Sequence, residues 1–599
     1  MDSFEFEISE DFFADRAKRL ELNDGTHCFV VTNEGQVISV LKDKCSHMGG
    51  SLTAGASGFA CRTHGWLYDK AGKNLTPTNP GLTSLDFVVE GDKLTIFQKE
   101  AIELLPFGGA DLDGSEELEL LAHASFVLKV KDYQVLFDPW FTGDAYWGSW
   151  RLWPDNPIGA DKLKALTHVI VTHPHPDHFN VDSLKLLNRS VQFFFPDFVS
   201  RIIPETLRSL GFKNLNPVPW ESRVEISSDV TFAFLRPNTL WEDSAVLVRV
   251  GDWLWLNQSD AGAPLEDSLV PHGLDLLSST FDPGASGYPL TYDLSMDKKL
   301  SIVRNSKQQM LTTISQRCET VGAKHFAPFA GWWRHCLDEH QLLAEMLEHV
   351  TLEDLELLFS GAGTRLLPTI PSSRINLKSM DMVFDSNVAK SMSLPVRVSS
   401  LPEYTPRLSD EHLFVSVREA IGNLASNSRA TRSEDVIFSV TIEGIQQTVV
   451  ARFGDATSDP VHIHVAISRR IAELVVEGDR TVTWNHIDIG YWGRWSRDSD
   501  RYPSNFMRLL QLGYVPEFQT KGEALAIDSV LGVNVAHALE VAPDVVSKIL
   551  SRAGLPCVSC QHSLTETLES ALDIHKVGAV QREVALAELS VALGHANSV

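Results

Sequence analysis

The chain has 599 residues, of which 43% are hydrophobic and 22% charged, so length and composition predict several globular domains. Its formal net charge of −26 argues against nucleic acid and anionic membranes as partners, because these polyanions would repel it. No apolar stretch approaches the roughly 18 residues that a membrane span needs, and the acidic N-terminus lacks the features of a signal peptide. With only seven cysteines, the chain is expected in a reducing compartment, the cytoplasm.

Residues 1–105 contain short apolar runs separated by Gly, Asn and Asp turns, such as HCFVVTNEGQVISVL. This pattern predicts a small all-β domain. Two of its loops each carry one cysteine and one histidine: Cys45 with His47, and Cys61 with His64. Two thiolates on one iron and two imidazoles on the other form the ligand set of a [2Fe–2S] cluster of the Rieske type.

The second loop continues as HGWLYD, and the two loops together resemble those of Rieske ferredoxins and Rieske oxygenases. The resemblance implies a Rieske [2Fe–2S] domain that accepts and passes single electrons. A zinc ion bound by the same four residues is the alternative, because CxH and CxxH spacings also suit zinc.

From Leu118 to about residue 365, strand-like runs such as THVIVTH and VTFAFLRP alternate with helical stretches such as VDSLKLLN. This alternation of strands and helices predicts an αββα sandwich of two sheets over residues 118–365. A Pro/Ser-rich stretch opens an expected linker, residues 366–404. Residues 405–599 predict a mixed α+β domain, so the fold class is a multidomain one.

The run His173-Pro-His175-Pro-Asp177-His178 directly follows an apolar strand. Four ligand-type residues in six positions seldom arise for packing, and their spacing suits two adjacent metal ions. With the upstream stretches HASF and FDPWF, this run resembles the metallo-β-lactamase fold over residues 118 to about 345.

The resemblance implies roles for further residues. His123 and Asp138 are expected to support the ligands from behind, without binding metal themselves. Asp260 matches the bridging carboxylate, and His325 is the natural candidate for the last ligand, with His335 as the alternative.

Between His178 and Asp260 there is no histidine, although zinc hydrolases of this fold place a ligand there. Asp243 or Glu242 occupies that register, so a carboxylate is expected in place of the imidazole. Oxygen-rich ligation shifts the preference from zinc toward iron, and iron sites with open positions activate O₂. The alternative is that both acids are surface residues and that one metal binds.

A Rieske domain joined to such a site resembles the CMP-N-acetylneuraminate hydroxylase family, which the stretches Ser286–Leu290 and Lys324–Ala330 also resemble. The expected function is a Rieske-dependent non-haem iron oxygenase, or hydroxylase, that acts on a small molecule. An external reductase or ferredoxin would supply electrons, since the chain shows no flavin or nicotinamide motif. A zinc hydrolase with a redox-sensing Rieske domain, and a simple electron carrier, are the competing interpretations.

The C-terminal region gives weaker signals. His462 and His464 share one face of a predicted strand, where a half-buried strand is favoured over a metal site. Cys557 and Cys560 form a CxxC with His562 nearby, and metal or redox use and simple structural thiols remain equally open.

Overall fold

The computed structural model describes most of residues 2–498 and scattered positions of 499–599, and the longest gaps before 499 are 9–16, 44–51, 74–81, 99–111, 262–269 and 427–434. The chain divides into two compact units. The first holds Met1–Glu403 with Ile487–Tyr491, and the second holds Tyr404–His486 with Trp492–Val599. Among the described residues, no helix combines the length and apolar character that crossing a bilayer requires.

The N-terminal part of the first unit is built from strands, which confirms the predicted all-β domain. A six-stranded sheet has the order β1-β9-β8-β4-β3-β2, and a three-stranded sheet has the order β5-β6-β7. The strands are β1 (Asp2–Glu7), β2 (Ala17–Glu21), β3 (His27–Asn33), β4 (Gln36–Lys42), β5 (Leu52–Gly55), β6 (Gly58–Cys61), β7 (Leu67–Tyr68), β8 (Ser84–Glu90) and β9 (Lys93–Gln98).

The hairpin of β5 and β6 lies in sequence between the two predicted cluster loops. Gly58 closes it with a φ of +146°, where an added Cβ would lie 2.0 Å from the carbonyl oxygen of Tyr68. Cys61 is the last residue of β6. The side chain of Cys61, and Cys45, His47 and His64 altogether, lie outside the described residues.

Two large sheets follow, as predicted. One has the order β16-β15-β14-β12-β11-β10-β25-β26 and the other β17-β18-β19-β20-β21-β22-β24. The strands of the first sheet are β10 (Glu117–Ala122), β11 (Ser125–Val130), β12 (Tyr133–Phe137), β14 (His168–Ile170), β15 (Gln192–Pro196), β16 (Leu215–Val218), β25 (Arg374–Asn376) and β26 (Met382–Val383). Those of the second are β17 (Val224–Glu225), β18 (Val230–Leu235), β19 (Ala245–Val250), β20 (Trp253–Ser259), β21 (Leu276–Thr280), β22 (His325–Phe329) and β24 (Arg365–Leu366).

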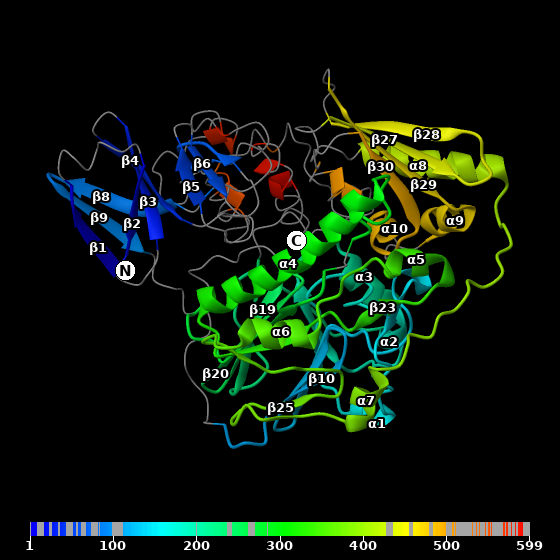
Figure 1. Ribbon diagram of the computed structural model, residues 1–599, viewed down its shortest axis with the longest axis horizontal. Coiled ribbons are helices and arrows are strands. Elements are labelled where there is room, and N and C mark those ends of the chain that lie inside the picture. Colours follow the sequence, from blue (N-terminus) through cyan, green and yellow to red (C-terminus); the bar gives the residue numbers. More distant parts are fainter. Residues whose placement is uncertain are drawn as a thin grey trace. The chain divides into compact units, whose positions relative to one another are not determined.

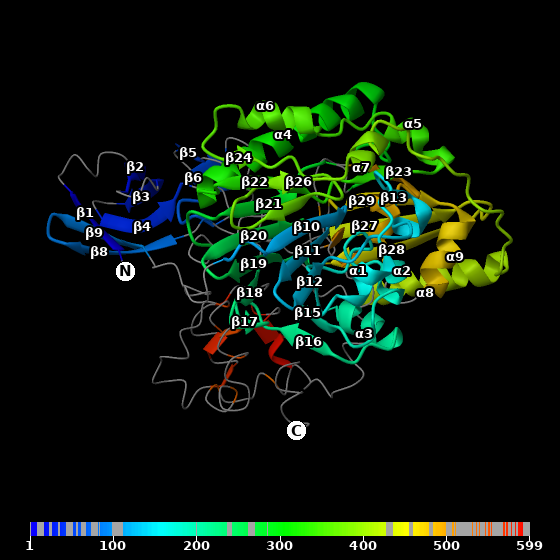
Figure 2. The same cartoon turned by 90° about the horizontal axis from the view of Figure 1, so that it is seen from below.

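A continuous apolar core lies between the two sheets and includes Phe126 and Phe137 from one and Phe232 and Trp255 from the other. Helices cover both outer faces, and Figure 2 shows α4 and α6 along the sheet that contains β20 to β22. The helices are α1 (Ala160–Lys164), α2 (Val181–Lys185), α3 (Ile202–Ser209), α4 (Met296–Val321), α5 (Gln341–Ala344), α6 (Leu352–Phe359) and α7 (Ser386–Ser391). This is the predicted αββα sandwich.

Strand direction determines where a site can form. β12, β14 and β15 pair in parallel in the first sheet, and β20, β21 and β22 pair in parallel in the second. The carboxyl ends of parallel neighbours meet at one edge of a sheet, so loops that follow these strands collect there. A two-stranded ribbon of β13 (Trp150–Leu152) and β23 (Trp333–His335) adds to the same unit.

The segment expected as a linker, 366–404, is instead partly built into the sandwich. β25 pairs with β10, with Ile375 opposite Leu118, and both side chains are fully buried. The Pro/Ser-rich composition favoured a linker, but such a stretch can still supply a short strand next to the edge of a sheet when one apolar residue reaches the core.

The second unit contains a four-stranded sheet of order β28-β27-β29-β30 with α8 and α9, drawn in yellow to orange in Figure 1. Its elements are α8 (Asp410–Ser426), β27 (Asp435–Ile442), β28 (Thr448–Gly454), β29 (Val461–Ile467), α9 (Arg469–Glu477) and β30 (Gly493–Arg497), while α10 (Asn485–Ile489) runs into the first unit. In β29 the Nδ1 of His464 lies 3.0 Å from Ser439 Oγ, and His462 is exposed. Neither residue joins a potential metal-binding group among the described residues. Cys557, Cys560 and His562 lie outside these residues.

Replacing Phe232 by alanine should lower the free energy of unfolding by about 3–5 kcal/mol, because a buried aromatic ring would leave a cavity between the sheets. Urea-induced unfolding measures the change. Leu357→Ala is the control, since Leu357 is 78% exposed and its loss should change stability by less than about 0.5 kcal/mol. Equal effects for the two variants would contradict the assignment of the core.

Candidate metal centre

The loop after β14 is held in place by one buried carboxylate. Asp138, just after β12, accepts hydrogen bonds from the backbone N of Thr172 at 2.7 Å and from its Oγ1 at 2.8 Å. The Nδ1 of His178 lies 3.0 Å from Asp138 Oδ2, which turns the Nε2 of His178 toward the centre of the site. Asp138 therefore supports a ligand from behind, as the sequence suggested.

The second sheet supplies two carboxylates to the same place. Asp260 directly follows β20, and Asp243 precedes β19. Ser244 donates a hydrogen bond from Oγ to the carbonyl oxygen of Thr172 at 2.7 Å, which ties the Asp243 segment to the histidine loop. His178 Nε2 lies 3.3 Å from Asp260 Oδ2, and His173 Nε2 lies 4.0 Å from Asp243 Oδ1.

Seven side chains form three overlapping groups that could each hold a metal ion: His123, Asp177 and His178; His173, His175 and Asp243; and His173, His178 and Asp260. Within each group the ligand atoms lie within 4.8 Å of one another. The third group shares one histidine with each of the other two. Such an arrangement suits two adjacent ions.

Several buried polar atoms of this cluster have no hydrogen-bond partner within the described part of the chain. The buried atoms that lack a hydrogen bond of acceptable geometry are Nδ1 and Nε2 of His123, Nε2 of His173 and of His178, Oδ1 of Asp243 and Oδ1 of Asp260. Burying such groups without partners is costly, about 1–3 kcal/mol each and more for charges. A bound cation would satisfy them together, so the residues present fit a metal.

The electrostatics agree with this interpretation. Burial lowers the pKa of His173 well below its usual value, which leaves the ring neutral and able to bind metal. Burial and the neighbouring Asp260 raise the pKa of Asp243 to about 7. Burial would also raise the pKa of Asp177, but His178 and His123 lower it below its usual range. Crowded acids of this kind are stabilised when a cation lies between them.

The structure brings together six of the seven residues predicted to bind the second metal site: His173, His175, Asp177, His178, Asp243 and Asp260. Between the two acids left open by the sequence, Asp243 joins the cluster. Glu242 instead accepts a hydrogen bond at Oε1 from the backbone N of Ser200 at 2.8 Å.

The seventh, His325, does not reach the cluster. It is the first residue of β22, at the edge of the sheet opposite to Asp260, and its Nδ1 lies 2.9 Å from the carbonyl oxygen of Asp275. The alternative, His335, lies on β23, where its Nδ1 is 3.1 Å from Ser149 Oγ. Neither belongs to a potential metal-binding group in the described part of the chain.

His123 was expected to support the ligands from behind, but it lies in a group that could itself hold a metal ion. It occupies the turn between β10 and β11, beside an irregularity in the strand register, and its Nε2 lies 3.4 Å from Asp177 Oδ2. The ring packs edge-on against Trp140 at 5.0 Å between centroids. The HASF stretch signalled its importance, but only the fold shows that it faces the ligands.

Replacing His123 by alanine should remove about one metal ion per chain, because the group with Asp177 and His178 loses an imidazole. Metal analysis of purified protein measures this. His325→Ala is the matched control and should keep the full metal content. Loss of metal from the control alone would restore His325 as a ligand.

Comparison with protein families agrees with both domains. A model described as Rieske [2Fe-2S] domain matches residues 8–86, a stretch that includes all four predicted cluster ligands. A model described as beta-lactamase superfamily domain matches residues 133–254.

Solved structures that match part of this chain include a possible metal-dependent hydrolase from Veillonella parvula, with 14% identity, a TM-score of 0.30 and coverage of 44% of this chain and 99% of that one. They also include CmlA, a diiron beta-hydroxylase from Streptomyces venezuelae, with 14% identity, a TM-score of 0.29 and coverage of 46% and 55%.

Curated relatives carry the name cytidine monophosphate-N-acetylneuraminic acid hydroxylase. The protein of Danio rerio is 26% identical over 341 residues, which cover 52% of this chain and 56% of that protein. That of Xenopus laevis is 25% identical over 336 residues, with the same coverage. The chain thus spans about half the length of the curated relatives it matches. It combines a Rieske [2Fe–2S] domain with a metallo-β-lactamase-like domain and resembles the CMP-N-acetylneuraminic acid hydroxylases.

Proposed function

We propose that the chain is a Rieske-dependent non-haem iron oxygenase that hydroxylates a small molecule at the metal centre of its αββα sandwich. The observation that carries the proposal is the donor set. Asp243 joins the cluster with His173 and His175, where the resemblance to this fold implies a histidine in zinc hydrolases, and the same chain carries a Rieske domain.

The donor set of four imidazoles and three carboxylates suits iron. Carboxylates are harder ligands than imidazole, so Asp177, Asp243 and Asp260 shift the preference away from zinc. Bound there, iron with open coordination positions would supply O₂ activation. The protein contributes buried ligands for the metal, since His123, His173 and His178 are almost completely shielded from solvent. Such shielding strengthens every electrostatic interaction inside the site.

The Rieske cluster, held by Cys45, His47, Cys61 and His64, would supply single electrons to this chemistry. Its own electrons would come from an external reductase or ferredoxin. A cytoplasmic location agrees with the buried free thiols of Cys318 and Cys336. CMP-N-acetylneuraminate, the compound in the names of the relatives, is the first substrate to test.

A zinc hydrolase with a redox-sensing Rieske domain is the second candidate. The intact run from His173 to His178, which contributes to three overlapping groups of potential ligands, is also what a hydrolase of this fold requires. Metal identity therefore separates the two functions.

Protein purified without added metal or chelator should contain about three or four irons per chain and little zinc, because the Rieske cluster accounts for two. Elemental analysis provides the count. O₂ uptake by the reduced protein should then rise when the right substrate is added. Two irons with one or two zincs would exclude the oxygenase and favour the hydrolase.

Replacing Cys45 by serine should abolish the visible absorption of the cluster, since a thiolate ligand is lost. Iron in the second domain should stay, and repeated turnover with O₂ should cease for want of electrons. Cys318→Ser is the control, because Cys318 is a buried free thiol on α4. Sustained substrate hydroxylation without the cluster would contradict electron delivery through it.

A further inference from the structure

A tyrosine outside the predicted site contacts one of its carboxylates. Tyr146 lies between β12 and β13 and donates a hydrogen bond from its hydroxyl group to Asp177 Oδ1 at 2.7 Å. Its side chain is only 2% exposed.

The two oxygens of Asp177 face different partners. Oδ1 accepts the bond from Tyr146, whereas Oδ2 lies 3.4 Å from His123 Nε2 and 3.8 Å from His178 Nε2. These nitrogens belong with Asp177 to one of the potential metal-binding groups. Only Oδ2 is therefore directed at the place where a cation would sit.

The backbone around Tyr146 is in an unfavourable conformation. Tyr146 and Trp147 have φ values of 49° and 57°, in the left-handed region that bulky residues rarely adopt. Consecutive residues of this kind persist only where the surroundings impose them, and they gather at functional sites. The turn thus merits a functional explanation beyond packing.

Aromatic stacking imposes the turn from one side. The Tyr146 ring packs edge-on against Trp150 at 4.7 Å between centroids. Trp150 in turn stacks on Trp333 at 3.5 Å with an angle of 5° between the rings. Trp150 and Trp333 lie on the paired strands β13 and β23, so the ribbon fixes the position of the tyrosine.

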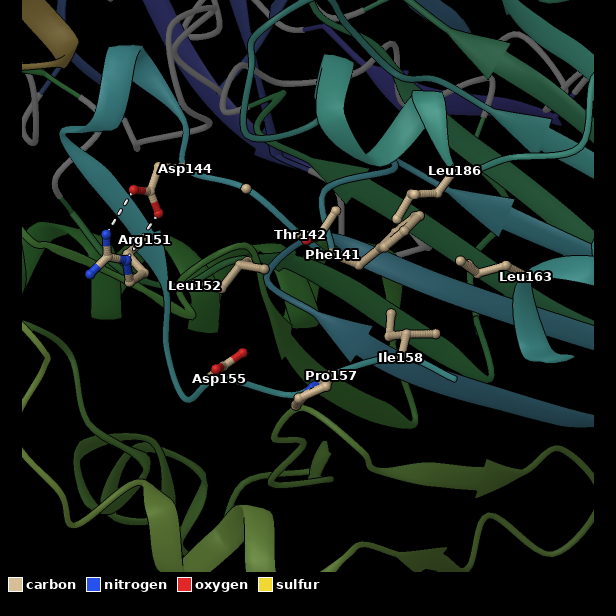
Figure 3. Close-up of a pocket in the computed structure, with 11 residues that line it drawn as sticks. Phe141, Thr142, Asp144, Arg151, Leu152, Asp155, Pro157, Ile158, Leu163 and Leu186 are labelled. Carbon is tan, nitrogen blue, oxygen red and sulfur yellow. Dashed lines mark hydrogen bonds and ion pairs between the residues drawn. The ribbon is translucent and has the colours of Figure 1, made fainter. Parts of the chain in front are cut away.

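Polar contacts fix the same turn from its two ends. Ser149 Oγ lies 3.1 Å from Nδ1 of both His335 and His340. Arg151 donates two hydrogen bonds to the Asp144 carboxylate, at 3.0 and 2.8 Å, and Figure 3 shows this pair at the rim of a pocket of about 340 Å³. Tyr146 is therefore held rigidly against Asp177.

We propose that Tyr146 is a positioning residue that makes Asp177 a one-oxygen metal ligand, by holding Oδ1 and leaving Oδ2 to the ion. A carboxylate that binds through both oxygens would occupy one more coordination position. Keeping that position open leaves room for a substrate or oxygen atom. The inference rests on the proposed metal centre but does not require that the native metal is iron.

Tyr146→Phe tests the proposal, with Tyr491→Phe as the matched control. Tyr491 is also a buried tyrosine of the first unit, but its hydroxyl group has no hydrogen-bond partner among the residues that the structure describes. The full chain is loaded with Co²⁺ at the second site, and its affinity is measured by competition with a chelator. The Rieske cluster also absorbs visible light, so the d–d absorption of the bound Co²⁺ is taken as the difference between Co²⁺-loaded and Co²⁺-free protein. It reports the coordination number, since the absorption weakens as that number rises.

Tyr146→Phe should lower Co²⁺ affinity by about 10–100-fold, the usual effect of losing a partner that orients a ligand. It should also weaken the absorption of the bound ion, because Asp177 becomes free to bind through both oxygens. Tyr491→Phe should change neither. Thermal unfolding of the metal-free variants checks that both fold.

An unchanged Co²⁺ spectrum in Tyr146→Phe would overturn the proposal whatever happens to affinity, because a purely structural role lowers occupancy without altering the bound ion. Since the test uses Co²⁺ and no O₂, its outcome is independent of whether the enzyme is an oxygenase or a hydrolase.

Discussion

The metal centre depends on the carboxylate of Asp138, which is fully buried at the end of β12. By accepting hydrogen bonds from Thr172 and by contacting His178 Nδ1, it orders the start and the end of the histidine loop at once. A histidine whose Nδ1 is engaged in this way presents Nε2 to a metal in a defined direction. One side chain thus converts a local sequence motif into a convergent set of ligand atoms.

The ligand atoms come together only because both sheets contribute residues to the site. The loop after β14 supplies histidines, and the second sheet supplies Asp243 and Asp260 at the neighbouring edge. Bringing these two acids together in a buried place is unfavourable without a cation. The raised pKa of Asp243 is a sign of this, because burial and the charge of Asp260 disfavour its ionised form. Metal binding and correct packing of the sandwich are therefore expected to be linked, because the same ion relieves repulsion between elements of both sheets.

The sequence predicted the αββα sandwich and the ligand-bearing loop because both are local patterns: apolar runs of strand length, and four ligand residues in six positions. It also placed Asp260 well, since that residue directly follows a strand.

The positions of His123 and His325 relative to the other ligands could not be predicted from the sequence alone. For His123, the direction of a turn beside an irregular register decides its role. For His325, the deciding fact is that it begins β22, so it lies at the opposite edge from the other ligands. No sequence pattern pointed to Tyr146, because the residue it contacts, Asp177, lies 31 positions away in the chain.

The carboxylate of Asp243 favours one type of reaction only when it is considered together with the Rieske domain. A hydrolase needs a metal to activate water and needs no electrons, so neither an oxygen-rich donor set nor a Rieske domain would improve it. An oxygenase needs both, since O₂ activation requires a metal that changes its oxidation state and a supply of single electrons. The proposed restriction of Asp177 to one oxygen keeps a position at the metal open, which either chemistry can use. The carboxylate-rich donor set and the Rieske domain, in separate parts of the sequence, thus favour the same class of reaction, although each one alone would be compatible with another.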